Sequence, residues 1–190
     1  MKKCNFLYLF ILSAGIIFSG FRVNAQDIWK RGKLRVAKNG HDLCFEDGYP
    51  FFWLGDTGRE LFHRLTIPEI KLYLDNRASQ GMNVIQAVVL AEFDGLRKPN
   101  RYGDIPFNHE NTTQPNETYF KIIDSTIHLA FENGIFIGLL PTWGDKVTRN
   151  RGAGPVIFDS LKAYTYGKWI GNRNKTNPKY NLDIRRRQAG

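Results

Sequence analysis

Polar and aromatic side chains that could do chemistry follow three apolar stretches of this sequence. Carboxylates accept charge-assisted hydrogen bonds from sugar hydroxyls, and an aromatic ring covers the apolar side of a sugar ring. This combination favours carbohydrate as the substrate class. The residues expected to face the substrate are Asp56, Gln86, Glu92, Asp94, Trp143, Asp145 and Lys146. For Asp56 and Asp145 an alternative stays open, namely that they only cap turns after strands.

Other kinds of chemistry find little support in the sequence. It shows no His, Cys, Asp and Glu group with metal-ligand spacing, no glycine-rich phosphate loop and no Gly-x-Ser-x-Gly elbow. We therefore predict no metal, no cofactor and no nucleotide. His63, between Phe62 and Arg64, is expected to be a hydrogen-bonded structural histidine.

The spacing of apolar residues predicts an α/β protein that places these side chains at the carboxyl ends of parallel strands. In such folds ligands bind at that edge of the sheet. The strongest strand signal is residues 135–140, an unbroken apolar run between Gly134 and Pro141, which is typical of a strand buried on both faces. The predicted strands are residues 51–54, 83–90 and 135–140, and the predicted helices are residues 67–80, 117–133 and 160–173.

Local signals place the ends of several elements. Asn39-Gly40 lies between two short strand candidates, residues 33–38 and 41–46, and predicts a β-hairpin at the amino-terminal end. Thr66 and Glu69 form a capping-box pattern at the start of the helix at 67–80. The polar connection at 91–116 is unusually long, and connections of this length are uncommon unless they are functional or disordered.

The first 25 residues have the pattern of a secretory signal peptide. Two lysines precede an apolar core, and Val23, Asn24 and Ala25 supply the small-residue cleavage pattern. We expect an exported protein that is periplasmic, on the cell surface or secreted. The apolar core is short for a membrane span, and no transmembrane segment is expected after signal removal.

The net charge and the cysteines bound the remaining possibilities. Removal of residues 1–25 takes away Lys2, Lys3 and Arg22 and lowers the formal charge from +9 to +6. Residues 168–190 hold the whole of that excess, so a solvated basic tail is favoured over nucleic-acid binding. Cys44 is the only cysteine after residue 25, so no internal disulfide is predicted.

Four motifs then resemble one family. They are FFWLGDT at 51–57, VIQAV at 84–88, EFDGL at 92–96 with Pro99 and Asn100, and LLPTWGDK at 139–146. In this order they look like the amino-terminal half of the apiosidase-like catalytic domain, glycoside hydrolase family 140. The resemblance implies a (β/α)8 TIM barrel that removes apiose side chains from the pectin rhamnogalacturonan II.

The sequence also departs from this family. The resemblance implies that the acid/base aspartate and the nucleophile lie beyond the chain end, so no catalytic residue is assigned. The chain is also shorter than the about 200–250 residues of a complete barrel. We expect a partial TIM barrel of about three βα units at 26–178, preceded by the short β-hairpin, and a basic tail at 179–190. The change of character near residues 177–179 predicts a frameshift or gene break there.

The sequence therefore predicts a glycoside hydrolase of the apiosidase-like type that is inactive by itself. Its partners would be a pectic polysaccharide or oligosaccharide and, to complete the barrel, a complementary carboxyl-terminal fragment. Two alternatives stay open. One is a secreted, non-catalytic glycan-binding fragment, and the other is a binder of anionic polymers through the basic tail.

Overall fold

The computed structural model describes residues 25–149 and 154–175 of the 190-residue chain. Apart from Ala25, the predicted signal peptide lies outside these residues, as do the predicted break near residues 177–179 and the basic tail. The helices are α2 (Ala25–Trp29), α3 (Leu61–Arg64), α4 (Ile67–Ser79), α5 (Glu117–Glu132) and α6 (Ser160–Lys175). The strands are β1 (Leu34–Val36), β2 (Leu43–Phe45), β3 (Pro50–Phe51), β4 (Gly55–Gly58), β5 (Val84–Leu90) and β6 (Phe136–Thr142).

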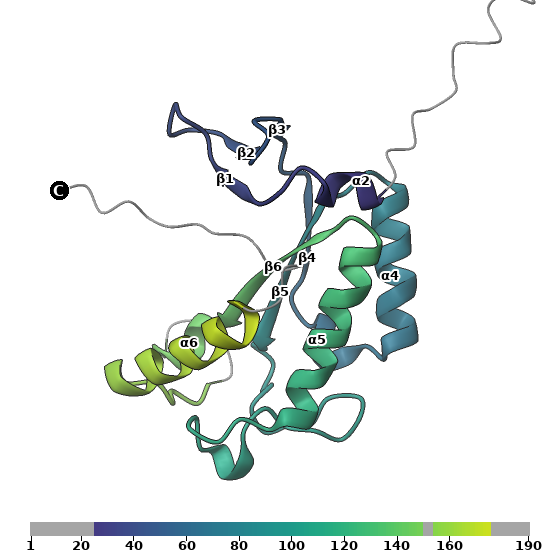
Figure 1. Ribbon diagram of the computed structural model, residues 1–190. Coiled ribbons are helices and arrows are strands. Elements are labelled where there is room, and N and C mark those ends of the chain that lie inside the picture. Colours follow the sequence, from purple (N-terminus) through teal and green to yellow (C-terminus); the bar gives the residue numbers. More distant parts are fainter. Residues whose placement is uncertain (1–24, 150–153, 176–190) are drawn as a thin grey trace, which may run out of the picture.

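The strands form two sheets that lie at different levels of the molecule (Figure 1). β4, β5 and β6 are parallel and neighbour one another in chain order. β1, β2 and β3 form a separate antiparallel sheet. The α/β class and the parallel order agree with the sequence prediction. Among the described helices, none is long and apolar enough to cross a membrane.

One face of the parallel sheet is covered by α4 and α5. Ile85, Ala87 and Val89 alternate along β5 and belong to the main apolar core. Ile70 from α4 and Ile123 from α5 belong to the same core. Because side chains alternate between the two faces of a strand, these β5 positions must share one face. The helices on that face bury the apolar surface that holds this part of the chain together (Figure 1).

The opposite face of the parallel sheet carries a row of small and polar residues. The strand register places Thr57 beside Gln86 and Gln86 beside Gly138. Thr57 and Gln86 are exposed. A Cβ added to Gly138 would lie 3.4 Å from Cγ of Gln86, so the glycine gives the Gln86 side chain room. The middle of this face therefore presents an amide and a hydroxyl to its surroundings.

The antiparallel sheet covers the amino ends of the parallel strands (Figure 1). Leu34 and Phe45 of this sheet share a buried cluster with Val84 and Phe136, the first residues of β5 and β6. The predicted hairpin around Asn39-Gly40 is confirmed by the pairing of β1 with β2. The hairpin closes one end of the sheet, which leaves the carboxyl ends of β4, β5 and β6 on the other side.

The predicted helices are confirmed with small differences at their ends. The capping box at the start of α4 forms, because the backbone N–H and the hydroxyl of Thr66 both donate to Oε2 of Glu69, at 2.7 and 2.8 Å. Asn116 caps α5 by accepting a hydrogen bond from the backbone N–H of Thr118 at 3.1 Å. Both caps satisfy backbone donors that have no partner within their own helix.

The predicted strand at 51–54 is wrong. Phe51 ends β3, and the first parallel strand is Gly55–Gly58. The side chains of Phe52, Trp53 and Leu54 are exposed, with Phe52 at 78%. The prediction that 135–140 is buried on both faces is also only partly right, because β6 is half-buried along most of its length.

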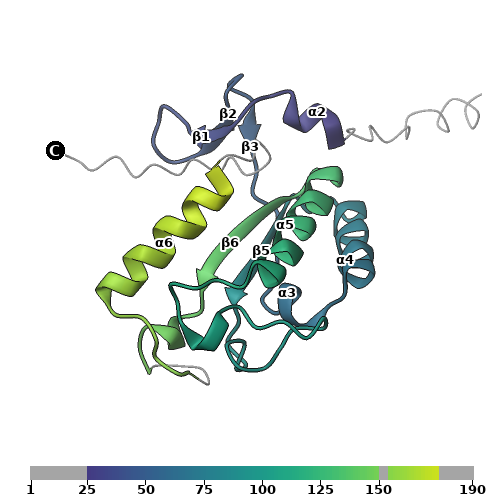
Figure 2. The ribbon, with the colours of Figure 1, turned by 60° about the horizontal axis from the view of Figure 1, so that its bottom comes forward.

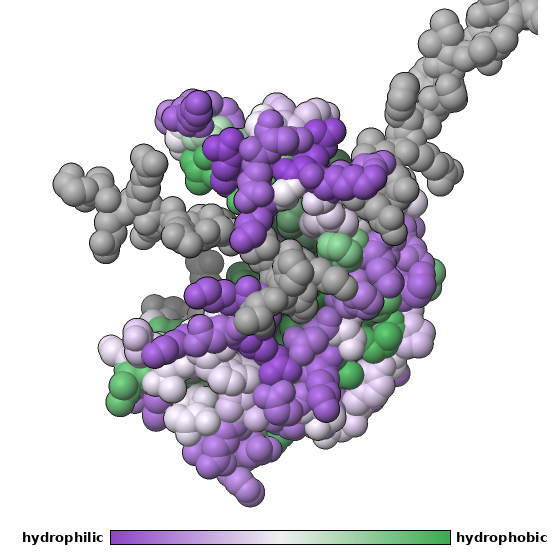
Figure 3. Space-filling view, in the orientation of Figure 1, coloured by the Kyte–Doolittle hydropathy of each residue, from purple (hydrophilic) through white to green (hydrophobic). Residues whose placement is uncertain are grey.

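α6 lies beside β6, away from α4 (Figure 2). The hydroxyl of Tyr166 donates to the backbone oxygen of Pro141 at 2.9 Å, which ties α6 to β6. On the face of the molecule seen in Figure 3, hydrophilic residues dominate and the hydrophobic areas are small and separate.

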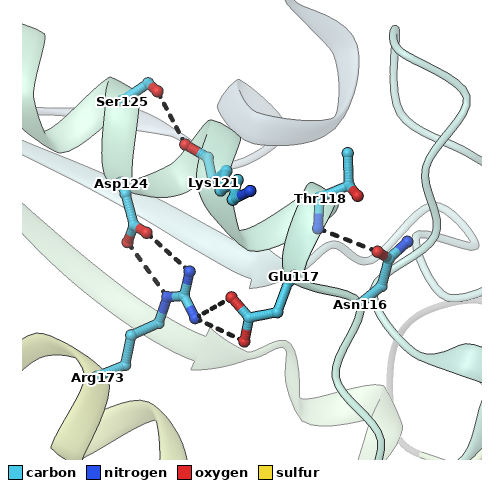
Figure 4. A network of polar contacts seen from close by, with 7 residues as sticks. All are labelled: Asn116, Glu117, Thr118, Lys121, Asp124, Ser125 and Arg173. Carbon is cyan, nitrogen blue, oxygen red and sulfur yellow. Dashed lines mark hydrogen bonds and ion pairs between the residues drawn. The ribbon is translucent and has the colours of Figure 1, made fainter.

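Arg173 joins α6 to α5 through two carboxylates (Figure 4). Its Nη1 contacts Oε2 of Glu117 at 2.7 Å and its Nη2 contacts Oδ2 of Asp124 at 2.8 Å. The guanidinium also lies over the rings of Phe120 and Trp169, 5.6 and 5.5 Å from their centroids. One cation thus combines two ion pairs with two aromatic contacts.

Replacing Arg173 with alanine is expected to lower the free energy of unfolding by about 1–2 kcal/mol. The cost stays moderate because both carboxylates are partly exposed and remain hydrated after the change. Urea denaturation would measure it. Arg97→Ala is the matched control, since Arg97 makes one exposed ion pair, with Glu110. An equal cost for the two variants would contradict a special role for Arg173.

Candidate functional site

Three side chains meet at the carboxyl ends of the three parallel strands, one after each strand. Arg59 directly follows β4, Glu92 lies two residues after β5, and Trp143 directly follows β6. Nη1 of Arg59 contacts Oε1 of Glu92 at 3.1 Å. The guanidinium of Arg59 lies 5.4 Å from the centroid of the Trp143 ring. We call Arg59, Glu92 and Trp143 the strand-end cluster.

The strand-end cluster combines the groups that bind sugars. Glu92 supplies carboxylate acceptors for hydroxyl groups, Arg59 supplies N–H donors, and the indole of Trp143 supplies an aromatic face. The side chain of Arg59 is 52% exposed, whereas that of Glu92 is 14% exposed. Arg59 therefore exposes part of its guanidinium to solvent and also holds Glu92 in place.

The turn that carries Glu92 is shaped by Asp94 and Gly95. Asp94 has a positive φ of 61°, and its backbone oxygen accepts hydrogen bonds from the N–H groups of Arg97 and Lys98. A Cβ on Gly95 would lie 2.8 Å from Cβ of Ala91, so this position requires glycine. Asp94 was predicted to face the substrate. The structure gives its backbone a role in the turn, and substrate contact by its side chain stays a prediction.

Asp56 was predicted to follow the first strand, and that position is wrong because Asp56 lies within β4. Its carboxylate accepts a hydrogen bond from the Tyr73 hydroxyl at 2.9 Å and pairs with Arg77, both on α4. A hydrogen bond from the backbone of Thr57 and the bond from Arg77 lower the pKa of Asp56. These contacts favour a structural role for Asp56, which ties β4 to α4.

Asp145 and Lys146 form a buried ion pair instead of an open site. Nζ of Lys146 contacts both carboxylate oxygens of Asp145, at 2.9 and 2.8 Å, and both side chains are fully buried. Asp145 also accepts a hydrogen bond from the backbone N–H of Gly154 at 2.9 Å. The backbone oxygen of Lys146 accepts from Ile157 and Phe158. The pair therefore anchors the chain after β6, and these contacts favour a structural role.

His63 is buried and hydrogen-bonded on both sides, as expected of a structural histidine. Its Nδ1 lies 3.1 Å from Oε2 of Glu60 and its Nε2 lies 2.9 Å from the backbone oxygen of Lys98. Within the described residues there is no group of three or more His, Cys, Asp or Glu side chains arranged to hold a metal ion.

Of the seven residues predicted to face a substrate, the structure brings Glu92 and Trp143 together. Gln86 lies on the exposed polar row of the same sheet, between Thr57 and Gly138. Arg59 is a member of the cluster that the sequence analysis did not predict. Its signal was its position directly after Gly58, which is visible only when the strand is placed at Gly55–Gly58.

Comparison with solved structures places the chain among glycoside hydrolase folds. A glycoside hydrolase family 5 structure from Bacteroides vulgatus ATCC 8482 matches with a TM-score of 0.69 and 31% identity, over 80% of this chain and 32% of that chain. A second structure, described as a glycoside hydrolase, matches with a TM-score of 0.66 and 32% identity, over 80% of this chain and 33% of the other. A third, also from B. vulgatus, has 18% identity and a TM-score of 0.57 and shows the fold alone.

The fold and these similarities thus define a glycoside hydrolase-like protein. The family model for the apiosidase-like catalytic domain matches residues 37–181, and the chain belongs to this family. The chain spans about a third of the length of the first two solved structures that it matches. No curated protein matches it.

Proposed function

We propose that this chain is part of a glycosidase that hydrolyses O-glycosyl bonds in the side chains of plant cell-wall pectin. The observation that carries the proposal is the convergence of Arg59, Glu92 and Trp143 at the carboxyl ends of three neighbouring parallel strands. In α/β barrels this edge of the sheet is where active sites are built. Membership of the apiosidase-like family supports the same class of substrate.

We further propose that β4, β5 and β6 are three of the eight strands of a TIM barrel. The polar row of Thr57, Gln86 and Gly138 would then face the barrel interior, and α4 and α5 would belong to its outer ring. Two features support this arrangement. The strands are parallel and sequential in the sheet, and helices cover the face opposite to the row.

Arg59 makes an acidic glycan the favoured ligand. Guanidinium groups bind carboxylates with two parallel hydrogen bonds, and pectin carries uronate carboxylates. Glu92 occupies Nη1 of Arg59, and the side chain remains half exposed beside the Trp143 ring. A uronate could therefore pair with Arg59 while the ring of a neighbouring sugar packs on Trp143.

We assign the strand-end cluster to substrate binding. We assign no described residue to the role of catalytic acid or nucleophile. Glycoside hydrolysis uses two carboxyl groups on either side of the scissile bond. Asp56 and Asp145 are committed to ion pairs, and Glu92 is held by Arg59. We therefore expect the chain alone to bind the glycan without cleaving it. Action on an external glycan agrees with the export that the first 25 residues predict.

Replacing Trp143 with alanine is expected to weaken binding of a pectic oligosaccharide about tenfold, because the aromatic face is lost. Isothermal titration calorimetry with oligogalacturonides that carry apiose side chains would measure the change. Tyr164→Ala is the matched control, since Tyr164 is an exposed aromatic residue on α6 outside the cluster. Equal binding by the wild type and Trp143→Ala would contradict the proposed site.

A second arm of this experiment addresses the charge. Arg59→Ala should weaken binding of the uronate form more than that of the same oligosaccharide with its carboxyl groups reduced. Arg31→Ala is a close control, because Arg31 also has one carboxylate partner, Asp47, and one ring, Tyr49, but lies in the region before the hairpin. If both variants bind as tightly as the unsubstituted chain, and high salt abolishes that binding, the anionic-polymer alternative would be favoured.

A further inference from the structure

We propose that His63 is a positioning residue, whose doubly protonated imidazole holds the turn that carries Glu92 against α3. The proposal concerns how the site is assembled. It rests on the proposed function only in taking Glu92 as part of a binding site, and its test does not require a glycan.

The geometry around His63 connects two parts of the chain. On one side Nδ1 lies 3.1 Å from Oε2 of Glu60, the residue that follows Arg59. On the other side Nε2 lies 2.9 Å from the backbone oxygen of Lys98, near the end of the turn that begins at Glu92. The imidazole is therefore a bridge between the loop after β4 and the loop after β5. These loops supply two of the three members of the strand-end cluster.

The two partners of His63 fix its protonation state. A backbone carbonyl oxygen can only accept a hydrogen bond, and an ionised carboxylate can only accept as well. Both ring nitrogens must then carry a proton, so the ring that makes both bonds is an imidazolium. In neutral His63 one nitrogen would hold a lone pair facing an oxygen lone pair, and one of the two contacts would be lost.

The charges around the bridge agree with this assignment. Hydrogen bonding to Glu60 is the largest cause that raises the pKa of His63, burial and the nearby Arg64 lower it, and the bond to Lys98 raises it further. Burial raises the pKa of Glu60, but the hydrogen bond and the charge of His63 outweigh it, and the resulting pKa of Glu60 is lowered. From α5, the hydroxyl of Tyr119 donates to the backbone oxygen of Val89 at 2.6 Å and stays protonated, because burial raises the pKa of Tyr119.

The sign of the pH dependence follows from these directions. A histidine whose pKa is higher in the folded than in the unfolded state stabilises the fold fully below its unfolded value of about 6.5. That contribution is lost as the pH rises through the raised folded value. We therefore expect the turn at residues 92–98 to be held most firmly below about pH 6.5 and to loosen as the pH rises through the raised pKa of His63.

The test is nitrogen-15 NMR of the histidine rings in the full chain, combined with amide hydrogen exchange of residues 92–98 as a function of pH. We expect protons on both ring nitrogens of His63 at pH 6.5, and a pKa above the ordinary histidine value of about 6.5. The protection factors of the turn should fall by about tenfold as His63 loses its proton, which corresponds to the loss of one charge-assisted hydrogen bond. A neutral His63 ring at pH 6.5, or protection that does not change as the ring titrates, would overturn the proposal.

Variants separate positioning from general stability. His63→Gln should leave the turn weakly protected at every pH and remove the pH step, whereas the matched variant His41→Gln should retain the step. A His63→Gln variant that kept the wild-type step would overturn the proposal. If His63→Gln does not fold, the ring protonation and turn protection of the unsubstituted chain still decide the question. If the unsubstituted chain binds no glycan while its His63 protonation and turn protection are as expected, the proposed function would fail and the positioning role of His63 would stand.

Discussion

Replacement of Lys146 with methionine is expected to lower the free energy of unfolding by about 3–5 kcal/mol, because the substitution leaves Asp145 as a buried charge without its partner. Both side chains are almost fully inaccessible to water, at 0% and 1% exposure. The methionine has a similar length and fills the space of the lysine stem, so the change tests the charge more than the volume. Urea denaturation followed by circular dichroism would measure the loss. It should be a large part of the total stability, which is about 5–15 kcal/mol for a domain.

Two controls separate the buried charge from other effects. Lys162→Met removes an exposed pair with Asp159, in which the N···O distance is 3.6 Å, and should change the stability by less than about 1 kcal/mol. The double variant Asp145→Asn with Lys146→Met removes both charges and should recover much of the loss, because no isolated buried charge remains. A double variant as unstable as Lys146→Met would contradict the electrostatic explanation.

Helix positions could be predicted from the sequence because their signals are local. The capping box of Thr66 and Glu69, and the glycines at 81 and 134, lie within or next to the helices that they delimit. Both glycines have a positive φ, 81° and 71°, a conformation that glycine adopts at low cost and that ends a helix. The spacing of apolar residues is local as well, and in the structure Ile70 and Leu74 of α4 and Ile123 and Ile127 of α5 are buried.

The first parallel strand could not be predicted because its position depends on a partner far along the chain. Residues 51–54 are more apolar than Gly55–Gly58, yet only the latter pair with β5. Asn83 lies directly before β5. Its side chain donates to the backbone oxygen of Phe52 at 2.7 Å and accepts from the N–H of Leu54 at 2.9 Å. The Asn83 side chain thus binds backbone groups of the segment before β4, and local hydrophobicity carries no sign of this contact.

The candidate site was predicted only in part, because the place of the first strand depends on a distant partner. Glu92 and Trp143 follow strands whose apolar runs are continuous, so their place at the strand ends was visible. Arg59 was missed because the first strand was placed four residues too early. The burial of Asp145 and Lys146 has no sequence signal either, since two neighbouring opposite charges are usual on surfaces.

Replacing Phe120 with alanine is expected to lower the free energy of unfolding by about 3–5 kcal/mol, because a fully buried ring is removed from the contact between α5 and α6. Phe120 is 1% exposed, and its ring centroid lies 4.6 Å from that of Trp169 on α6 and 5.5 Å from that of Tyr119. The cavity would lie beneath the guanidinium of Arg173, so α6 should detach more readily than α4. Hydrogen exchange would detect this as earlier loss of protection in α6, and urea denaturation would give the total cost.

Phe52→Ala is the matched control, because the ring of Phe52 is 78% exposed and its removal should change the stability by no more than about 0.5 kcal/mol. Equal costs for the two variants, or uniform loss of protection across all helices, would contradict the view that Phe120 fastens α6 to the rest of the fold.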